Sequence, residues 1–290
     1  MSHDFSSRLT ARILVEDFPP AVVGLDPRLD ALPDAVAPGA SPAQRIVAFY
    51  ESVLPRLARH VAAVKPNIAF FERYGAEGYA AYETTCRRAR ALGLLVIGDV
   101  KRGDIGTTAE AYADGHARIA DAVTLHPMLG TDSLAPFLDE SRRSGLGLFV
   151  LVRTSNASAA EFQDLATPEG TLSEVLATAV DRWGRDLGPA DGYSTVGAVV
   201  GATWPEQLVR LRRRMPRAWL LLPGVGAQGA RVADVLPAFD ASGLGALVTQ
   251  SRAVMQTFAR AEDRYADSIE HAAAAFAAEV RAVVAQARAR

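Results

Sequence analysis

Short apolar segments of strand type recur eight times along this chain, and helical segments separate them. Several are apolar almost throughout, such as LGLLVIG at 92–98 and WLLLPGV at 219–225. Runs of this kind suit strands whose two faces are both buried, as in a parallel sheet. The predicted strands are Val22–Asp26, Ala62–Asn67, Leu94–Lys101, Ala122–His126, Gly147–Thr154, Thr195–Thr203, Trp219–Val225 and Ala246–Arg252. Alternation repeated eight times predicts an α/β protein built as a single (β/α)8 TIM barrel over residues 1–290.

The segments between the predicted strands are rich in Ala, Arg and Glu and have helical spacing. The predicted helices are Pro42–His60, Tyr74–Leu92, Ser133–Ser144, Leu172–Gly188, Pro205–Met215, Val232–Ser242 and the last segment, Tyr265–Arg290. Ser41 is placed to cap the first of these helices, and Gly93 and Gly145 suit helix ends. An open, doubly wound sheet is the structural alternative, but no G-x-G-x-x-G follows the first strand.

Charge and composition exclude several classes of partner. The formal net charge is −2 at pH 7 and the pI is about 6.2, so no basic footprint for nucleic acid is present. Charged residues interrupt the amino-terminal segment, which leaves no apolar stretch of signal-peptide length. No segment approaches the roughly 18 apolar residues of a membrane span. We therefore expect a soluble cytoplasmic protein whose single cysteine, Cys86, forms no disulfide and is packed in a helix.

The sequence GDVKRGDI at residues 98–105 places two acids and two cations directly after a buried strand. Side chains two apart on a strand share a face, so Asp99 and Lys101 are expected to point together into the barrel mouth. Gly103 lets the chain turn, and Asp104 then projects from the loop. Because opposite charges offset desolvation, the lysine should stay protonated and the carboxylates ionised. Taken alone, the motif also fits a structural plug of ion pairs.

Two further strand ends deliver charges to the same mouth. Asp26 ends the first strand, and Lys65 lies near the end of the second. Bringing several lysines and aspartates together costs desolvation free energy, which a purely structural role does not explain. Such clusters are typical of a charged reaction site. No cluster of histidines and carboxylates accompanies them, so a metal centre is the less favoured interpretation.

The segments after the seventh and eighth strands carry a different signal. Glycines recur in PGVGAQG at 223–229, around Gly226, where bare backbone N–H groups can approach an anion. Ser251 and Arg252 follow the last strand and open a predicted helix. In α/β barrels these two loops commonly hold a phosphate group, aided by a helix N-terminus and a bidentate arginine. The residues thus predict an enzyme with a lysine–aspartate centre that acts on a phosphorylated small molecule, and they leave the reaction open.

Five blocks of sequence, taken in chain order, carry a resemblance to a known family. They are Gly24–Pro27, Lys65–Asn67 with Phe70–Glu72, the D-x-K-x-x-D motif at 99–104, Pro223–Gly229, and Ser251–Arg252. Together they resemble orotidine 5′-phosphate decarboxylases of the longer bacterial form. The D-x-K-x-x-D motif is shared with a wider decarboxylase and aldolase suprafamily, but the combination is far more specific. The resemblance implies conversion of orotidine 5′-monophosphate to UMP and carbon dioxide, the last step of de novo UMP synthesis. It also implies a homodimer with shared active sites and no metal or organic cofactor.

The resemblance implies a role for each charged residue of the mouth. Lys65, Asp99, Lys101 and Asp104 match the family's alternating tetrad, in which Asp104 reaches into the neighbouring subunit's site. Lys101 would stabilise the carbanion that forms at C6 as carbon dioxide leaves, and would then protonate it. Asp99 would face the substrate carboxylate or would mainly orient Lys101. Binding of the distant phosphate would hold the substrate in this arrangement.

The same resemblance implies the substrate contacts. Asp26, together with the first lysine of the tetrad, matches positions that hold the ribose hydroxyls, and Thr108 matches a ribose contact made across the interface. Gln228 and Arg252 match ligands of the phosphate. Ser155, after the fifth strand, matches the serine that reads the pyrimidine.

Three other functions fit parts of the pattern. Metal-dependent relatives, such as 3-keto-gulonate-6-phosphate decarboxylase or hexulose-phosphate synthase, carry a carboxylate where this chain has Lys65. A class I aldolase needs a neutral lysine for its Schiff base, whereas Lys101 is flanked by two aspartates that keep it protonated. A nucleotide-binding module without turnover would lack a member of the tetrad, and none is missing here.

Some features stay ambiguous in the sequence. The segment 156–171 is long for a barrel loop and is interpreted either as part of a lid or as surface decoration. His126, at the end of the fourth strand, either lines the site or packs as a neutral histidine. His116 lies in a helical context and is expected to face solvent.

Overall fold

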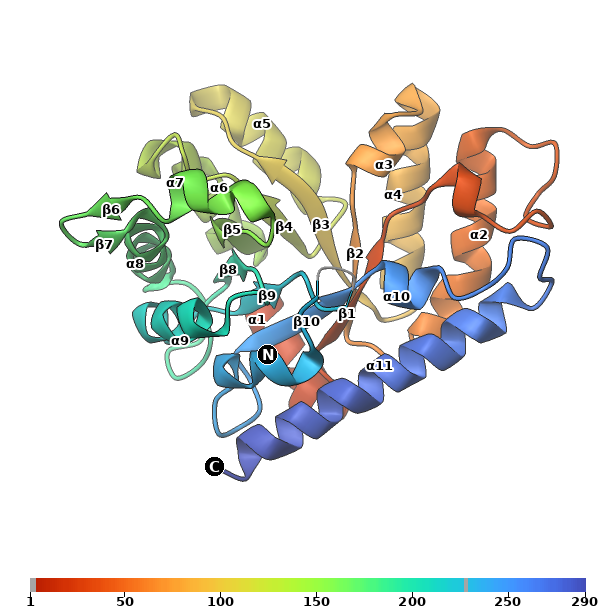
Figure 1. The fold of residues 1–290 in the computed structure, drawn as a ribbon. Helices are drawn as coiled ribbons and strands as arrows, with labels where there is room; N and C mark the ends of the chain where they lie inside the picture. Colours follow the sequence, from red (N-terminus) through yellow and green to blue (C-terminus); the bar gives the residue numbers. More distant parts are fainter. Residues whose placement is uncertain (1–3, 227–228) are drawn as a thin grey trace.

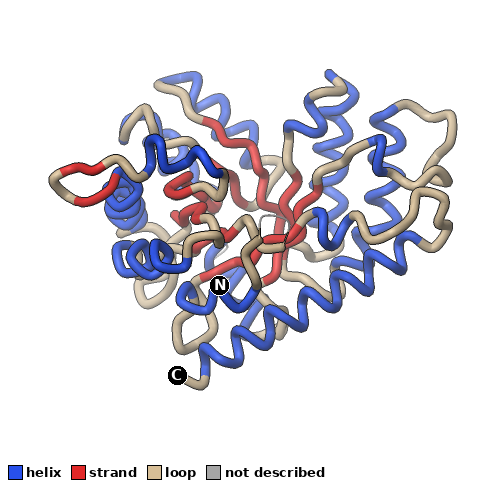
Figure 2. Tube along the Cα trace, in the orientation of Figure 1, coloured by secondary structure: helices blue, strands red, loops and turns tan. Residues whose placement is uncertain are grey.

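The predicted strands form a closed parallel barrel. The computed structural model describes residues 4–226 and 229–290. The barrel strands are β1 (Ala21–Leu25), β2 (Ala63–Pro66), β3 (Leu95–Arg102), β4 (Ala122–Leu125), β5 (Gly147–Arg153), β8 (Val196–Val200), β9 (Leu220–Leu222) and β10 (Ala246–Gln250). They pair in the cyclic order β1-β10-β9-β8-β5-β4-β3-β2, and Figure 2 shows them enclosed by helices. The predicted (β/α)8 TIM barrel is confirmed, because an open sheet would leave two unpaired edges.

Helices connect successive strands and lie outside the barrel. They are α2 (Pro42–Leu57), α3 (Ala69–Glu72), α4 (Gly75–Ala91), α5 (Gly106–Ala117), α6 (Thr131–Ser144), α8 (Leu172–Gly184) and α9 (Pro205–Arg214), followed after β10 by α10 (Arg252–Met255) and α11 (Tyr265–Arg288). Ser41 caps α2 in a reciprocal capping box with Gln44, as its position in the sequence indicated. Gly93 and Gly145 adopt φ angles of 80° and 78° after α4 and α6. Figure 1 shows α11 running along the lower edge of the molecule. Within the described ranges, no helix is both long and apolar enough to cross a membrane.

One connection differs from the sequence-based expectation, and another contains short elements that were not predicted. The segment Val232–Ser242 was predicted as a helix, but the structure has a shorter 3-10 helix, η3 (Val232–Ala238). Pro237 lies inside it and has no N–H group to donate, which limits α-helical hydrogen bonding. The β5–α8 connection contains η2 (Ala157–Ala159), α7 (Ala160–Gln163) and a small hairpin of β6 (Ala166–Thr167) and β7 (Gly170–Thr171). Figure 1 shows this hairpin projecting away from the barrel, and its suggested role in a lid stays a prediction.

An amino-terminal helix that was not predicted, α1 (Phe5–Leu14), closes the barrel at the amino ends of its strands. Phe5, Leu9 and Ile13 are spaced four residues apart, so they lie on one face of the helix, and all three are buried. They join the cluster formed by inward-facing strand residues such as Ile97 and Phe149. The rings of Phe5 and Phe149 meet edge to face with centroids 5.7 Å apart. The interior of the barrel is therefore filled with apolar side chains at this end.

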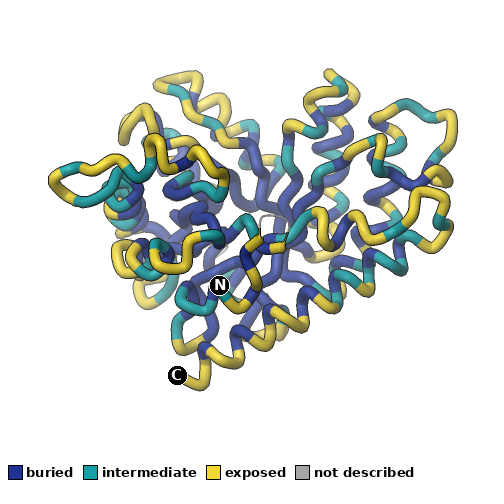
Figure 3. Tube along the Cα trace, in the orientation of Figure 1, coloured by how far each residue is buried: buried dark blue, intermediate teal, exposed yellow. Residues whose placement is uncertain are grey.

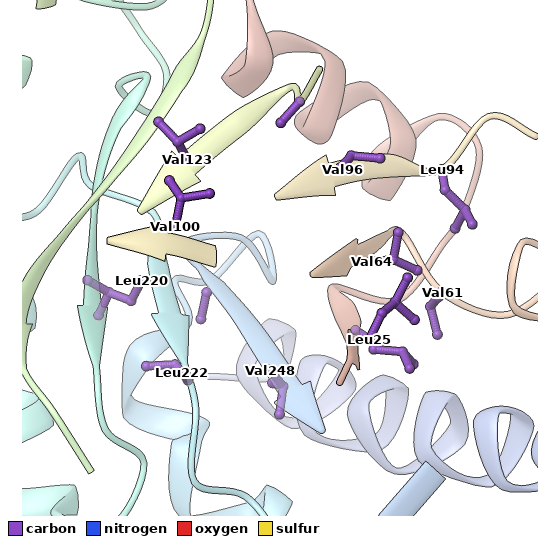
Figure 4. Packing of buried hydrophobic residues seen from close by; sticks show 14 of the residues in the cluster. Leu25, Val61, Val64, Leu94, Val96, Val100, Val123, Leu220, Leu222 and Val248 are labelled. Carbon is purple, nitrogen blue, oxygen red and sulfur yellow. The ribbon is translucent and has the colours of Figure 1, made fainter. Parts of the chain in front are cut away.

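A second apolar layer lies between the barrel and its helices. In β3, Val96 and Val100 belong to this outer layer, whereas Leu95 and Ile97 point into the barrel. This alternation between two buried faces explains why the strands read as continuous apolar runs. Figure 4 shows outer-layer side chains from several strands, and Figure 3 shows that the barrel is the most buried part of the molecule. Cys86 is fully buried in the same layer, as expected.

Shortening an α1 side chain tests whether this helix closes the barrel. Leu9→Ala should lower the free energy of unfolding by about 2–5 kcal/mol, because a buried cavity replaces the lost methyl groups. The control is Leu14→Ala in the same helix, whose side chain is half-exposed and whose loss should cost less than about 0.5 kcal/mol. Urea unfolding followed by circular dichroism measures both variants. Equal losses of unfolding free energy in the two variants would show that packing of the buried face of α1 does not stabilise the barrel.

Candidate active site

The carboxyl ends of β1, β2 and β3 bring acids and lysines together. The Nζ atom of Lys65 lies 2.6 Å from Oδ2 of Asp99, and the Nζ atom of Lys101 forms an ion pair with Oδ1 of the same carboxylate. The charge of Asp26, which follows β1, also acts on Lys65. The Lys65 and Asp99 side chains are only 11% and 10% exposed, whereas Lys101 is 48% exposed. Asp99 thus links a buried ammonium group to one that a ligand can reach.

Burial and charge act in opposite directions on this pair. Burial alone would lower the pKa of Lys65, but the charges of Asp99 and Asp26 and the hydrogen bond to Asp99 raise it above its ordinary value. Burial alone would likewise raise the pKa of Asp99, but the two lysines outweigh it and hold that pKa well below its usual range. Asp99 is therefore a carboxylate and Lys65 an ammonium group across the physiological pH range.

An irregularity in β3 directs Lys101. Between two regular pairs with β4, the three residues 99–101 of β3 face Thr124 alone. Lys101 has a φ of 47°, in the left-handed region that residues other than glycine rarely adopt. Bulges beside active sites commonly re-aim a side chain in this way. Asp99 and Lys101 therefore meet through a bulge, and not through the plain two-residue alternation that the sequence suggested.

Thr124 lies at the centre of this bulge and was missed by sequence reasoning. Its Oγ1 accepts hydrogen bonds from the backbone N–H groups of Val100 and Lys101, at 3.0 and 2.9 Å. The same hydroxyl donates to Oδ1 of Asp99 at 3.2 Å. The available signal was a single polar residue in the otherwise apolar strand AVTL.

The loops after β9 and β10 lie near the end of β1. The hydroxyl of Ser251 donates to Oδ2 of Asp26, while Oδ1 of Asp26 is buried and has no hydrogen-bond partner among the described residues. Buried carboxylate oxygens normally accept a hydrogen bond, so a ligand hydroxyl would satisfy this one. A Cβ atom on Gly226 would lie 3.6 Å from Nε2 of Gln250 and 3.7 Å from Cβ of Ala253, which places the glycine loop beside the end of β10.

The predicted phosphate ligands lie on the connections that follow β9 and β10. Arg252 is exposed and begins α10, a helix of only four residues, so the contribution expected from a helix dipole is small. Its guanidinium group makes no hydrogen bond or ion pair with the residues that the structure describes. Gly224 and Gly226 have φ angles of 105° and 83°, which only glycine adopts readily. Gln228 lies outside the described residues.

Three other predicted site residues stand apart from the charged cluster within one chain. Oδ1 of Asp104 accepts a hydrogen bond from the backbone N–H of Ile105 at 2.8 Å, and Asp104 forms no ion pair in the described part of the chain. Thr108 is exposed in the first turn of α5. Ser155 follows β5, where Gly201 allows close approach, since a Cβ atom there would lie 2.9 Å from Cα of Ser155.

The exposures of two histidines correct one sequence-based interpretation of each. His126 is exposed at the end of β4, so its interpretation as a packed residue is wrong. His116 was expected to face solvent, but it is buried on α5 and Nε of Arg102 donates to its Nε2 at 3.3 Å. Burial and the charge of Arg102 lower the pKa of His116 to about 4. The packing of α5 under the end of β3, which local sequence does not reveal, explains the difference.

A cavity of about 880 Å³ opens at the other end of the barrel, beside α1 and α4. Several arginines line it, but acids neutralise most of them: Arg8 pairs with Asp121 at 2.9 Å and Arg12 with Glu16 at 2.8 Å. The candidate chemistry is therefore assigned to the charged mouth.

The cluster can be observed selectively, because Lys65 and Lys101 are the only two lysines in the sequence. In protein labelled with 15N at the lysine side chains, Lys65 should titrate above its ordinary value of 10.5. Asp99→Asn should lower the pKa of Lys65, because the charge of Asp99 then no longer opposes the lowering of this pKa by burial. The pair should stabilise the fold fully below the unfolded pKa of lysine and lose this contribution as pH rises through the folded pKa of Lys65. On the acid side, the contribution should be lost as pH falls through the folded pKa of Asp99.

The matched control for this titration is Asp139→Asn, which removes an exposed acid that pairs with Arg142 on α6, away from the cluster. It should leave the titration of Lys65 unchanged. A Lys65 titration that does not move in Asp99→Asn would contradict the coupling described here.

Comparison with known proteins supports the family suggested by the motifs. Residues 22–257 match the model of the orotidine 5′-phosphate decarboxylase / HUMPS family. An orotidine 5′-phosphate decarboxylase from Rhodopirellula baltica is 42% identical over 273 residues, which cover 89% of this chain and 90% of that protein. One from Deinococcus radiodurans is 46% identical over 238 residues, or 80% and 82% of the two chains. The structure of Leishmania donovani OMP decarboxylase is 34% identical and covers 96% of this chain and 97% of its own, with a TM-score of 0.76. This chain therefore belongs to the orotidine 5′-phosphate decarboxylase family.

Proposed function

We propose that this protein decarboxylates orotidine 5′-monophosphate to UMP and carbon dioxide, the last step of de novo UMP synthesis. Membership of the family supports the reaction and the predicted cytoplasmic location. The observation that carries the proposal at the level of residues is the line of opposite charges Lys65–Asp99–Lys101 at the barrel mouth. It gives each of the two lysines a different environment and therefore a different role.

Lys101 is the residue that acts on the reacting carbon. When the bond between C6 and the carboxylate breaks, its electron pair stays on C6, and the ammonium group of Lys101 stabilises that charge. A proton then moves from Nζ to C6, which forms the new C–H bond of UMP and leaves an amine that regains its proton from solvent. The half-exposed side chain of Lys101 can reach a bound pyrimidine, whereas the buried Lys65 is enclosed by its partners.

Asp99 mainly orients Lys101. Both of its carboxylate oxygens are engaged by ammonium groups, one on each side. Its negative charge is thereby largely compensated, so repulsion of the substrate carboxylate is weaker than a free aspartate would exert. The alternative, in which Asp99 chiefly destabilises the bound substrate, requires that compensation to be lost on binding.

Recognition of the rest of the nucleotide falls to the neighbouring strand ends. Asp26 and Lys65 hold the ribose hydroxyls, and the unpaired Oδ1 of Asp26 supports this because it lacks a donor among the described residues. Ser155, at the end of β5, reads the pyrimidine. Gln228 and Arg252, with the backbone around Gly226, bind the phosphate, and the exposed guanidinium group of Arg252, unpaired within the described part of the chain, is suited to that contact.

The reaction is proposed to need no metal ion or organic cofactor. Metal-dependent relatives are expected to carry a carboxylate at the position of Lys65. Here the Nζ atom of Lys65 already lies 2.6 Å from Asp99, so positive charge occupies the place beside that carboxylate. A divalent cation at Asp99 would be repelled by two ammonium groups.

A homodimer is proposed in which Asp104 and Thr108 complete the partner's site. Ile105, Met128 and Leu129 are each more than half exposed, and all lie on the connections that follow β3 and β4. These connections meet where the N–H of His126 donates to the carbonyl of Arg102 at 2.8 Å. Large apolar side chains grouped in this way are typical of a protein interface. Asp104 and Thr108 lie on the same β3–α5 segment, so the interface would bring them to another copy of the chain.

Loss of the Lys101 amine should abolish turnover. Lys101→Ala should slow decarboxylation by about 10⁴-fold or more, because electrostatic stabilisation and general-acid catalysis each supply about 10²-fold or more. Loss of orotidine 5′-monophosphate absorbance, followed with a chelator present, measures it. The control is Arg142→Ala on the exposed face of α6, which should match the wild type. A wild type that is inactive only in chelator would favour the metal-dependent relatives, and one inactive under all conditions would overturn the proposed reaction.

Mixing two inactive variants tests the shared site. Asp104→Asn and Lys101→Ala homodimers should each be nearly inactive. After unfolding and refolding together in equal amounts, half of the dimers should be mixed, and each mixed dimer contains one site with both residues intact. Activity should therefore recover to about a quarter of the wild-type value for a twofold-symmetric dimer. Absence of recovery would show that Asp104 serves its own subunit or no site at all.

A further inference from the structure

The hydroxyl of Thr124 fills a gap in the barrel's hydrogen-bond ladder. Three residues of β3, 99–101, face this single residue of β4, so the regular exchange of backbone hydrogen bonds is interrupted there. Buried N–H groups nonetheless need acceptors. Oγ1 of Thr124 accepts from the N–H groups of both Val100 and Lys101, at 3.0 and 2.9 Å. One side-chain oxygen thus accepts two hydrogen bonds that backbone carbonyl groups would accept in a regular ladder.

These two hydrogen bonds hold Lys101 in an unusual backbone conformation. Its φ of 47° lies in a region that is unfavourable for a long side chain, and such a conformation persists only where surrounding contacts enforce it. Two consecutive N–H groups that converge on one oxygen restrict the rotation of the peptide between them. Thr124 is itself buried, so water does not compete for its hydroxyl.

The hydroxyl proton of Thr124 makes a third contact in the same group. It points to Oδ1 of Asp99 at 3.2 Å, the oxygen that also binds the ammonium group of Lys101. Thr124 therefore contacts Lys101 at both ends, directly at its backbone and through Asp99 at its Nζ atom. No other described residue of the tetrad is linked to both the backbone N–H and the Nζ atom of Lys101.

We propose that Thr124 is a positioning residue for Lys101, which sets the direction of the ammonium group toward the reacting carbon. This inference rests on the proposed function and adds to the tetrad a member that does not touch substrate. A threonine, or a serine, is required at this position, because the site needs one donor and two acceptor lone pairs on a short side chain. Valine has the same shape and offers none of them.

The test compares Thr124→Val, Thr124→Ser and Thr195→Val. Thr124→Val should lower kcat for orotidine 5′-monophosphate by about 100-fold, since misplacement of a reacting group by about 1 Å has that effect, while KM changes by less than about threefold. Thr124→Ser keeps the hydroxyl and should restore kcat to within about threefold of wild type. Thr195→Val is the matched control, because its buried hydroxyl bonds to Ser141 at 2.9 Å, near the amino ends of the strands. It should affect stability alone.

A spectroscopic readout separates positioning from folding. In protein labelled with 15N at its two lysines, Thr124→Val should shift the Lys101 side-chain signal and leave that of Lys65 close to its wild-type position. If Thr124→Val does not fold, Thr124→Ala provides the same comparison, because water can enter the smaller site and bond the exposed N–H groups.

Each outcome has a distinct meaning. A reduced kcat with a shifted Lys101 signal, rescued by serine and absent in Thr195→Val, supports the proposal. An unchanged kcat per folded molecule with an unchanged Lys101 signal overturns it, whatever the loss of thermal stability. If wild-type protein does not turn over orotidine 5′-monophosphate, the proposed function fails, and the Lys101 signal still decides whether Thr124 positions this lysine.

Discussion

The paired contacts of Asp99 with Lys65 and Lys101 are the interaction on which the rest of the site depends. One carboxylate holds two ammonium groups at the carboxyl end of the barrel, one buried and one half-exposed. If Asp99 were missing, the buried ammonium group of Lys65 would lose its nearest counter-charge, which is strongly destabilising. The arrangement keeps Lys101 positively charged and directed to the mouth, and it keeps Lys65 in place for the proposed ribose contact.

The barrel supplies the rigidity that this cluster needs. Two apolar layers, one inside the strands and one beneath the helices, fix the strand ends from which the charges project. α1 packs apolar side chains into the opposite end, so the charged cluster opens at the carboxyl end of the barrel. Against this background, the bulge in β3 and the left-handed conformation of Lys101 are local departures at the point where chemistry is proposed. Strain of this kind is commonly found at functional sites because the surrounding fold enforces it.

Much of the architecture followed from pattern, because periodicity and strand-end polarity are local properties. The apolar runs predicted all eight barrel strands, and the charges at 26, 65, 99 and 101 were expected at one mouth because parallel strands end together. Two of the misses have a common cause in tertiary packing. α1 was not recognised because its apolar face matters only once a barrel exists to receive it, and His116 is buried because α5 packs beneath Arg102. The segment 232–242 has helical spacing, but Pro237 within it lacks an N–H group, and a shorter 3-10 helix forms instead.

The amino-acid sequence by itself determined the fold class, the family motifs and which residue types lie at each strand end, because these depend on side-chain chemistry and on spacing of two or three to four residues. Only the tertiary structure decided how Asp99 is shared between two lysines, which lysine is accessible, and that Thr124 satisfies the backbone of the bulge. These are contacts between separate strands whose register includes an irregularity. The position of a bulge is set by how neighbouring strands pair around the closed barrel, and no short segment of sequence contains that information.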